Sequence, residues 1–300
     1  MDCKCKSLLA TILTAVFFST VLMSCVEEGS KVEEEITTDS TEENANSLFL
    51  VSGKVFSVPS PIQTAFLLKA AGTEYKPGML APTSHADQQA TSFEQALILG
   101  LYGADLAYVS IYNQNQDAIS YIKTVKQLSN SLNINGIFDE SMVSKYEKNV
   151  GNEDSLMAMV SEAFRLADGY LKENEQEDLS VMVLAGGWVE TLFFATNIVD
   201  EVESQDVQNR IGEQKVTIQN LIKLMVPFRD NQAVGGILGK LNELENIYDG
   251  IEFKYTFKEP VTDEVNKITH IKSESSVKMS AEQLAEITKK INEIRQDILN

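Results

Sequence analysis

The sequence has few of the residues that carry most metal and nucleophile chemistry. Its 300 residues include three cysteines and two histidines. His85 and His270 lie far apart in the sequence and neither has ligand-rich neighbours, so we expect no zinc site and no histidine-based triad. The G-x-S-x-G pattern is absent, and VGGILGKL departs from a phosphate-binding loop because Val234 replaces its first glycine and Leu241 follows Lys240. We therefore expect no metal and no cofactor.

Basic residues are also scarce. The chain has 25 lysines and arginines against 44 acidic residues, which gives a net charge of −19. A surface of this charge repels phosphate backbones, so we expect no nucleic acid partner. The same charge disfavours electrostatic attachment to anionic lipid, so any membrane contact needs another cause.

The first 25 residues provide such a cause. Lys4 and Lys6 precede a run from Leu8 to Met23 that is apolar apart from scattered serine and threonine. The run is too short for a comfortable membrane-spanning helix, which needs about 20 residues. A charged start followed by a short apolar run is typical of an export leader.

The leader ends in Leu22-Met23-Ser24-Cys25, which resembles the lipobox of bacterial lipoproteins. The resemblance implies diacylglycerol on the Cys25 thiol, cleavage before Cys25 and acylation of the new amino group. Several acyl chains give stable anchoring, whereas one chain binds only marginally. Val26 replaces the aspartate that signals retention in the inner membrane, so we expect the outer membrane, on its periplasmic side or at the cell surface. The alternative is an ordinary secretory leader with a chance cysteine.

Cleavage would remove Cys3 and Cys5, and lipid would occupy Cys25, so the mature body would have no free thiol and no disulfide. Residues 25–47 are acidic and poor in large apolar side chains, which predicts a disordered tether. An acidic segment at this place also resembles the surface-export signals of Bacteroidota lipoproteins. The alternative is that its charges only keep a spacer soluble.

Beyond the tether, apolar residues recur mostly with the helical period, which predicts a mainly α protein. Short connections favour an antiparallel helical bundle or stacked helical hairpins over residues 48–250. Residues 73–91 contain three turn-forming positions and no period, so we expect a long ordered loop there. Ser92 and Gln95 predict a capping box at the next helix. The expected helices cover residues 61–72, 92–112, 117–132, 139–149, 153–172, 178–200, 206–226 and 232–248.

Residues 251–300 have a different pattern. IEFKYTF alternates apolar and polar residues, which predicts a half-buried strand of a small β-hairpin, with KITHIKSESSVKM as the candidate partner. Ser280 and Gln283 predict the cap of a final helix. Its apolar seam suits a coiled-coil-like contact, but packing on the helical domain is favoured for so short a seam. The seam consists of Leu284, Ile287, Ile291, Ile294 and Ile298.

Two of the expected helices, 92–112 and 178–200, are apolar nearly all round, as central helices are. The first carries Gly100 and Gly103 and the second a Gly186-Gly187 pair, which allow close helix packing. A membrane span is the alternative for 178–200, although an acid in mid-helix costs roughly 2.5–3.5 kcal/mol. The segments LGLYGADLAY and LAGGWVETL resemble uncharacterised Bacteroidota lipoproteins. That resemblance spans residues 58–200 and implies no known activity.

Each central helix has one acid in its apolar stretch, Asp105 in the first and Glu190 in the second. Tyr108 and Tyr112 share a helical face with Asp105, and their hydroxyls can donate to a carboxylate. With Trp188 near Glu190, these side chains form a candidate ligand site or structural polar cluster. The acids could act as a glycosidase-like acid–base pair, but structural hydrogen bonding is the commoner role for buried acids, and we assign no catalytic residue.

Arg165 lies opposite the apolar stripe of its own helix, so we expect it to face solvent rather than either acid. Together these features predict a lipid-anchored cell-envelope protein of helical fold that serves as a binding, scaffold or accessory subunit. Its partners would be the membrane, through lipid on Cys25, and an envelope protein. The alternative is a hydrolase that uses Asp105 and Glu190.

Overall fold

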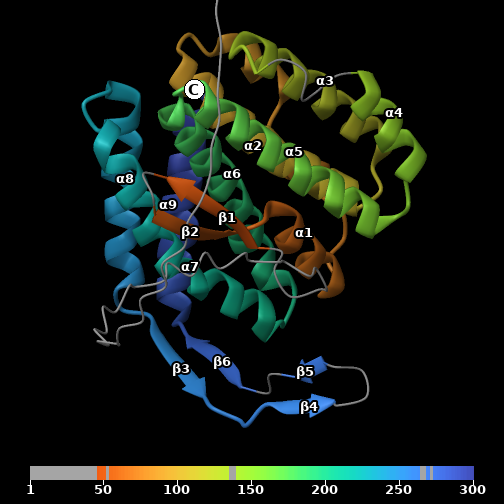
Figure 1. Cartoon of the computed structure of the whole chain (residues 1–300). Helices are drawn as coiled ribbons and strands as arrows, with labels where there is room; N and C mark the ends of the chain where they lie inside the picture. The colour runs from red at the N-terminus through yellow and green to blue at the C-terminus, as the bar shows by residue number, and fades with distance from the viewer. Residues whose placement is uncertain (1–45, 52–53, 135–139, 264–267, 271–272) are drawn as a thin grey trace, which may run out of the picture. The chain divides into compact units, whose positions relative to one another are not determined.

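The computed structural model describes residues 46–51, 54–134, 140–263, 268–270 and 273–300 (Figure 1). The predicted leader and residues 25–45 of the predicted tether lie outside the described residues. The described residues belong to one unit by their contacts.

The predicted mainly α class is confirmed, and each expected helix is found within a few residues of its predicted bounds. Short 3-10 helices occur at Pro77–Met79 (η1), Thr83–Gln88 (η2), Val199–Glu201 (η3) and Val226–Phe228 (η4). The α-helices are α1 (Pro61–Ala70), α2 (Ser92–Ile111), α3 (Asn115–Ser131), α4 (Glu140–Asn149), α5 (Glu153–Glu173), α6 (Glu177–Ile198), α7 (Gln205–Met225), α8 (Gln232–Tyr248) and α9 (Ala281–Leu299).

Helix α2 begins with a capping box, but in a different register from the predicted one. Thr91 and Glu94 form it, rather than Ser92 and Gln95. The Thr91 hydroxyl accepts the Glu94 N–H at 3.2 Å, and the Glu94 carboxylate accepts the Thr91 N–H at 2.9 Å. This register places a negative charge in the first turn, where it complements the positive end of the helix dipole.

Helices α2 and α6 lie at the centre of the fold and contact each other most extensively (Figure 1). Their backbones touch at two glycines. A β-carbon on Gly100 would lie 1.8 Å from the Val183 carbonyl oxygen, and one on Gly186 would lie 1.8 Å from the Leu97 carbonyl oxygen. Any larger residue at either position would force the helices apart. Close packing was predicted for these glycines, and the contacts confirm it.

The remaining helices cover this central pair. Helices α1, α3 and α5 pack on α2, whereas α7 and α9 pack on α6. Gly103 does not take part in the α2–α6 contact, because its α-carbon faces the Phe164 ring of α5. Among the described residues, one segment is long and apolar enough to cross a membrane, Glu177–Glu201, and most of it is buried inside the protein.

Helix α9 packs on α6 and α8, so its seam belongs to the helical body. The predicted capping box of Ser280 and Gln283 is present. Four isoleucines of the seam are buried, namely Ile287, Ile291, Ile294 and Ile298. Packing on the helical domain, the favoured expectation, is therefore confirmed.

The described strands form antiparallel pairs. β1 (Asn46–Val51) pairs with β2 (Lys54–Pro59) in a hairpin that the sequence reasoning did not predict. The predicted C-terminal hairpin is present as a longer ribbon, in which β3 (Glu252–Thr256) pairs with β6 (Glu274–Lys278) and β4 (Val261–Asp263) pairs with β5 (Ile268–His270). β2 and β6 both pack against α7.

The prediction that β3 is half-buried is wrong. Only the base of the ribbon is covered, where Val277 of β6 packs against Gly212 of α7 and Ile251 is buried. Three aromatic side chains that alternate with polar residues after Ile251 remain exposed, and we refer to them as the aromatic face. Their exposed fractions are 45% for Phe253, 66% for Tyr255 and 66% for Phe257.

The α2–α6 contact predicts that replacing a contact glycine even with alanine lowers the stability of the protein. Gly100→Ala or Gly186→Ala should lower the free energy of unfolding by about 1–3 kcal/mol or more, because the new methyl group meets backbone rather than a movable side chain. The matched control is Gly169→Ala in α5, where nothing lies within 4 Å of the added β-carbon. That variant should be as stable as wild type or more stable by up to about 1 kcal/mol. Urea unfolding measures both, and equal effects would contradict the close contact.

Candidate functional site: a buried carboxyl pair and an exposed aromatic face

Asp105 of α2 and Glu190 of α6 meet at the centre of the protein. The glycine contact between these helices brings the two acids together, and both side chains are fully buried. The two carboxyl groups lie close enough for the charge of Glu190 to raise the pKa of Asp105. The predicted pairing of acids on facing central helices is therefore present in the structure.

Arg295 of α9 neutralises this pair. Its Nε donates to Glu190 Oε2 at 2.6 Å and its Nη2 to Glu190 Oε1 at 2.8 Å, a bidentate arrangement. Nη2 also donates to the Met79 carbonyl oxygen at 2.8 Å. The guanidinium carbon lies 3.9 Å from the centre of the Phe193 ring, close enough for a cation–π interaction. Arg295 therefore joins α6, α9 and the loop before α2.

The hydrogen bonds indicate where the proton of the pair resides. Both Glu190 oxygens accept from Arg295, as a carboxylate does, whereas Asp105 accepts only the Ala81 N–H at 3.4 Å. Burial, followed by the charge of Glu190, raises the pKa of Asp105 well above its usual range. Burial also raises the pKa of Glu190, against the opposing effect of Arg295. We therefore assign the proton to Asp105 and the negative charge to Glu190, whose two oxygens bind Arg295.

Residues 73–91 form the predicted loop, now seen with the short helices η1 and η2, and side chains from three helices hold it over the acids. Tyr102 of α2 donates to the Pro82 carbonyl oxygen at 2.7 Å. Tyr121 of α3 donates to the Ala81 carbonyl oxygen at 2.6 Å. With the Arg295 bond to Met79 described above, these contacts satisfy loop carbonyls outside regular secondary structure.

The other members of the predicted cluster lie elsewhere. Tyr108 accepts the Lys76 N–H at 3.1 Å instead of donating to Asp105, and burial raises its pKa to about 12. The Tyr112 hydroxyl bonds to the Thr73 hydroxyl. Trp188 lies on another side of α6, where its Nε1 donates to Gln214 of α7 at 2.9 Å. The expected tyrosine donors therefore secure the loop rather than Asp105.

Sequence reasoning missed the cation. Arg165 faces solvent as predicted and pairs with exposed Glu162. Arg295 was not considered, although a signal was present: it lies four residues after Ile291 and three before Ile298, and so on the buried side of α9. A charged residue within an apolar seam predicts a buried partner.

This geometry is unsuited to hydrolysis. The two carboxyl groups of a glycosidase must both reach the substrate, whereas Asp105 and Glu190 are fully buried. Arg295 occupies both oxygens of Glu190. The apolar cavity beside Phe164 and the polar cleft beside Asn231 do not have either acid in their lining. No group of three metal-ligating side chains is found in the described ranges.

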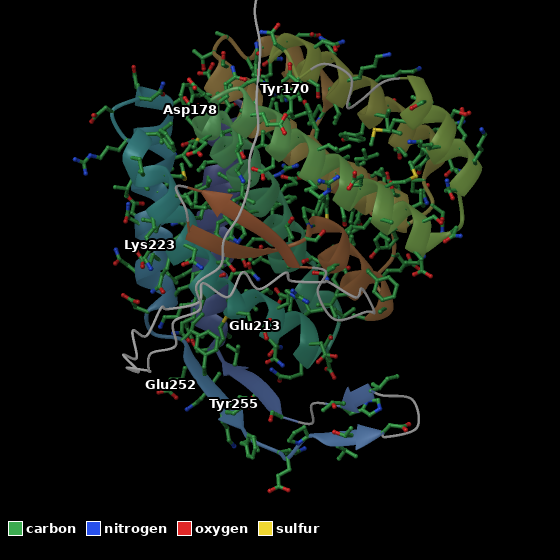
Figure 2. All side chains as sticks on the ribbon, in the orientation of Figure 1. Tyr170, Asp178, Glu213, Lys223, Glu252 and Tyr255 are labelled. Atoms are coloured by element: carbon green, nitrogen blue, oxygen red, sulfur yellow. The ribbon has the colours of Figure 1, made fainter. Side chains whose placement is uncertain are left out.

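The aromatic face is the most exposed group of large apolar side chains in the described residues. The charged residues Glu252 and Lys278, which the register pairs, lie on the opposite side of the ribbon. On the aromatic side, Phe253 pairs with Val277 and Tyr255 with Ser275. Figure 2 shows Glu252 and Tyr255 on this ribbon. The paired part of the aromatic face is therefore free of charge.

Comparison with known family models, with curated proteins and with solved structures gives no match. The function must therefore be inferred from the two features above. One is buried and closed, and the other is exposed and apolar.

The Glu190–Arg295 ion pair predicts a large loss of stability when the charge of Glu190 is removed. Glu190→Gln leaves Arg295 buried without a counter-charge, and the free energy of unfolding should fall by about 3–5 kcal/mol. Glu162→Gln is the matched control, since it removes an exposed partner of an exposed arginine and should cost less than about 1 kcal/mol. Adding Arg295→Met to Glu190→Gln should recover part of the loss. If urea unfolding shows the double variant to be less stable than Glu190→Gln alone, the Glu190–Arg295 ion pair is contradicted.

The proton on Asp105 predicts a pH dependence with a definite sign. Its pKa is raised in the folded protein, so its contribution to stability is present below the unfolded pKa of about 4 and is lost as pH rises through the folded pKa. Asn imitates the protonated acid and does not titrate. The free energy of unfolding of Asp105→Asn should therefore lie within about 1 kcal/mol of the wild-type value. As pH rises from 5 to 8, this variant should become more stable relative to wild type. Asp105→Leu should lose more, because it leaves the Ala81 N–H without an acceptor. Parallel pH profiles for wild type and Asp105→Asn would contradict the assignment.

Proposed function

We propose that this chain is a lipid-anchored protein of the bacterial cell envelope that acts by contact, as a binding, scaffold or accessory subunit, rather than by catalysis. The anchor would be lipid on Cys25, and the expected membrane is the outer membrane. The lipobox-like Leu22–Cys25 supports the anchor. The acidic surface supports it indirectly, since so negative a chain needs an anchor other than charge.

The observation that carries a contact function is the aromatic face. Phe253, Tyr255 and Phe257 are exposed together on one side of the ribbon. Aromatic side chains dominate the energetics of binding surfaces. If the ribbon had no partner, polar residues would be more favourable than exposed rings at these positions. A two-stranded ribbon is also marginally stable alone, which favours a further partner.

The hydrolase alternative receives less support. Its candidate acids, Asp105 and Glu190, are fully buried, and both oxygens of Glu190 are bound by Arg295. A substrate would have to displace the loop at Met79–Pro82 and break a bidentate ion pair before reaching either carboxyl group. A structural role accounts for both residues without such a rearrangement.

The anchor is tested by labelling cells with a palmitate analogue. Cys25→Ser should abolish both labelling and cleavage by the lipoprotein signal peptidase, because the modified thiol is lost. The matched control is Cys5→Ser, which lies within the expected leader and should leave labelling and cleavage unchanged. Unchanged processing of Cys25→Ser would overturn the proposed anchoring.

A further inference from the structure

We propose that the aromatic face rests on the surface of the phospholipid bilayer that carries the lipid anchor. This inference rests on the proposed lipid anchoring and names the partner of the contact surface. The ribbon would then be a second attachment that orients the helical body on the membrane.

The ribbon differs in charge from the rest of the chain. Residues 252–278 contain five lysines and five acidic residues, so they carry no net charge, whereas the whole chain carries −19. The acidic remainder is repelled by anionic headgroups, but the ribbon is not. It is therefore the part of the chain that can approach a bilayer without an electrostatic penalty.

The chemistry of the aromatic face fits the bilayer interface. Phe253 and Phe257 offer apolar rings, and Tyr255 combines a ring with a hydroxyl, the combination enriched where a membrane meets water. The charged pair of Glu252 and Lys278 lies on the other side of the ribbon and can stay in water while the rings enter the headgroup region.

The position of the ribbon in the fold places it within reach of the anchor. The ribbon joins the body at α7, through β6, and the hairpin that follows the tether joins at α7 as well, through β2. Helix α7 has 21 residues and is about 30 Å long. Residues 26–45 could span up to about 70 Å between Cys25 and β1, so the anchor and the aromatic face can meet the same bilayer.

A second copy of the chain fits this surface less well. Three rings at the observed exposure offer on the order of 350 Å² per copy, so two copies would bury well below the 1,200 Å² of a typical stable interface. Two bodies of charge −19 would also repel each other. A bilayer contact requires less binding free energy from each ring, because the lipid anchor already holds the chain beside the membrane.

The test uses the lipidated full chain in phosphatidylcholine vesicles with brominated acyl chains, which quench tryptophan that enters the bilayer. Tyr255→Trp adds a tryptophan to the aromatic face, and its emission should fall by roughly half or more relative to vesicles without bromine. Leu166→Trp in α5 is the matched control, since Leu166 is 40% exposed on a helix that packs on α2 and α6, and its emission should not change. Buried Trp188 contributes the same background to both. Phe257→Trp provides a second reporter if Tyr255→Trp does not fold.

The outcomes separate the two proposals. Quenching of the added tryptophan at Tyr255, unaffected by salt, supports the bilayer contact. Unquenched emission that shifts to the blue as protein density rises assigns the face to a second copy and overturns the bilayer contact alone. Unquenched and unshifted emission means that the face meets water, which overturns the contact function as well. A chain that does not float with the vesicles overturns the anchoring and, with it, this inference.

Discussion

The bidentate ion pair between Glu190 and Arg295 is the interaction on which the rest of the fold depends. It connects the central helix α6 to the last helix, α9, and through the Met79 carbonyl to the loop that precedes α2. Removing two ions from water costs several kcal/mol for each, and the bidentate hydrogen bonds to Glu190 together with the bond to the Met79 carbonyl offset this cost. Asp105 keeps its proton for the same reason, since a second buried negative charge would have only one cation to share.

Much of the helical architecture could be predicted because residues close together in the sequence determine it. The apolar period gives the helices, and the glycines of α2 and α6 mark the helices that pack most closely. Proline and glycine locate the loop at residues 73–91, but not its hydrogen bonds to α2, α3 and α9. Even a local signal can be ambiguous by one residue: Thr91-Ser92 followed by Glu94-Gln95 offers two capping boxes, and only the structure shows which one forms.

Features that depend on distant parts of the chain could not be predicted. Arg295 is more than a hundred positions from Glu190, and nothing near either residue specifies the other. Alternation along β3 predicts that Phe253, Tyr255 and Phe257 share one face, but period alone does not say whether another element covers them. The β1–β2 hairpin did leave a signal, a Ser-Gly pair between two apolar runs, which is typical of a tight turn.

The wide separation in sequence between Arg295 and its partners has a consequence for the order of folding. Contacts between Met79 and Arg295 close a loop of over two hundred residues, and His85 also binds the Leu299 carbonyl, at 2.6 Å. Until α9 is in place, Glu190 has no cation and the Met79 carbonyl lacks the Arg295 donor, so the interior has an uncompensated charge. Closure of the core therefore depends on contacts between residues more than two hundred positions apart in the sequence. Contacts of such separation carry a large loop-closure entropy and form slowly, so we expect the core to close late in folding.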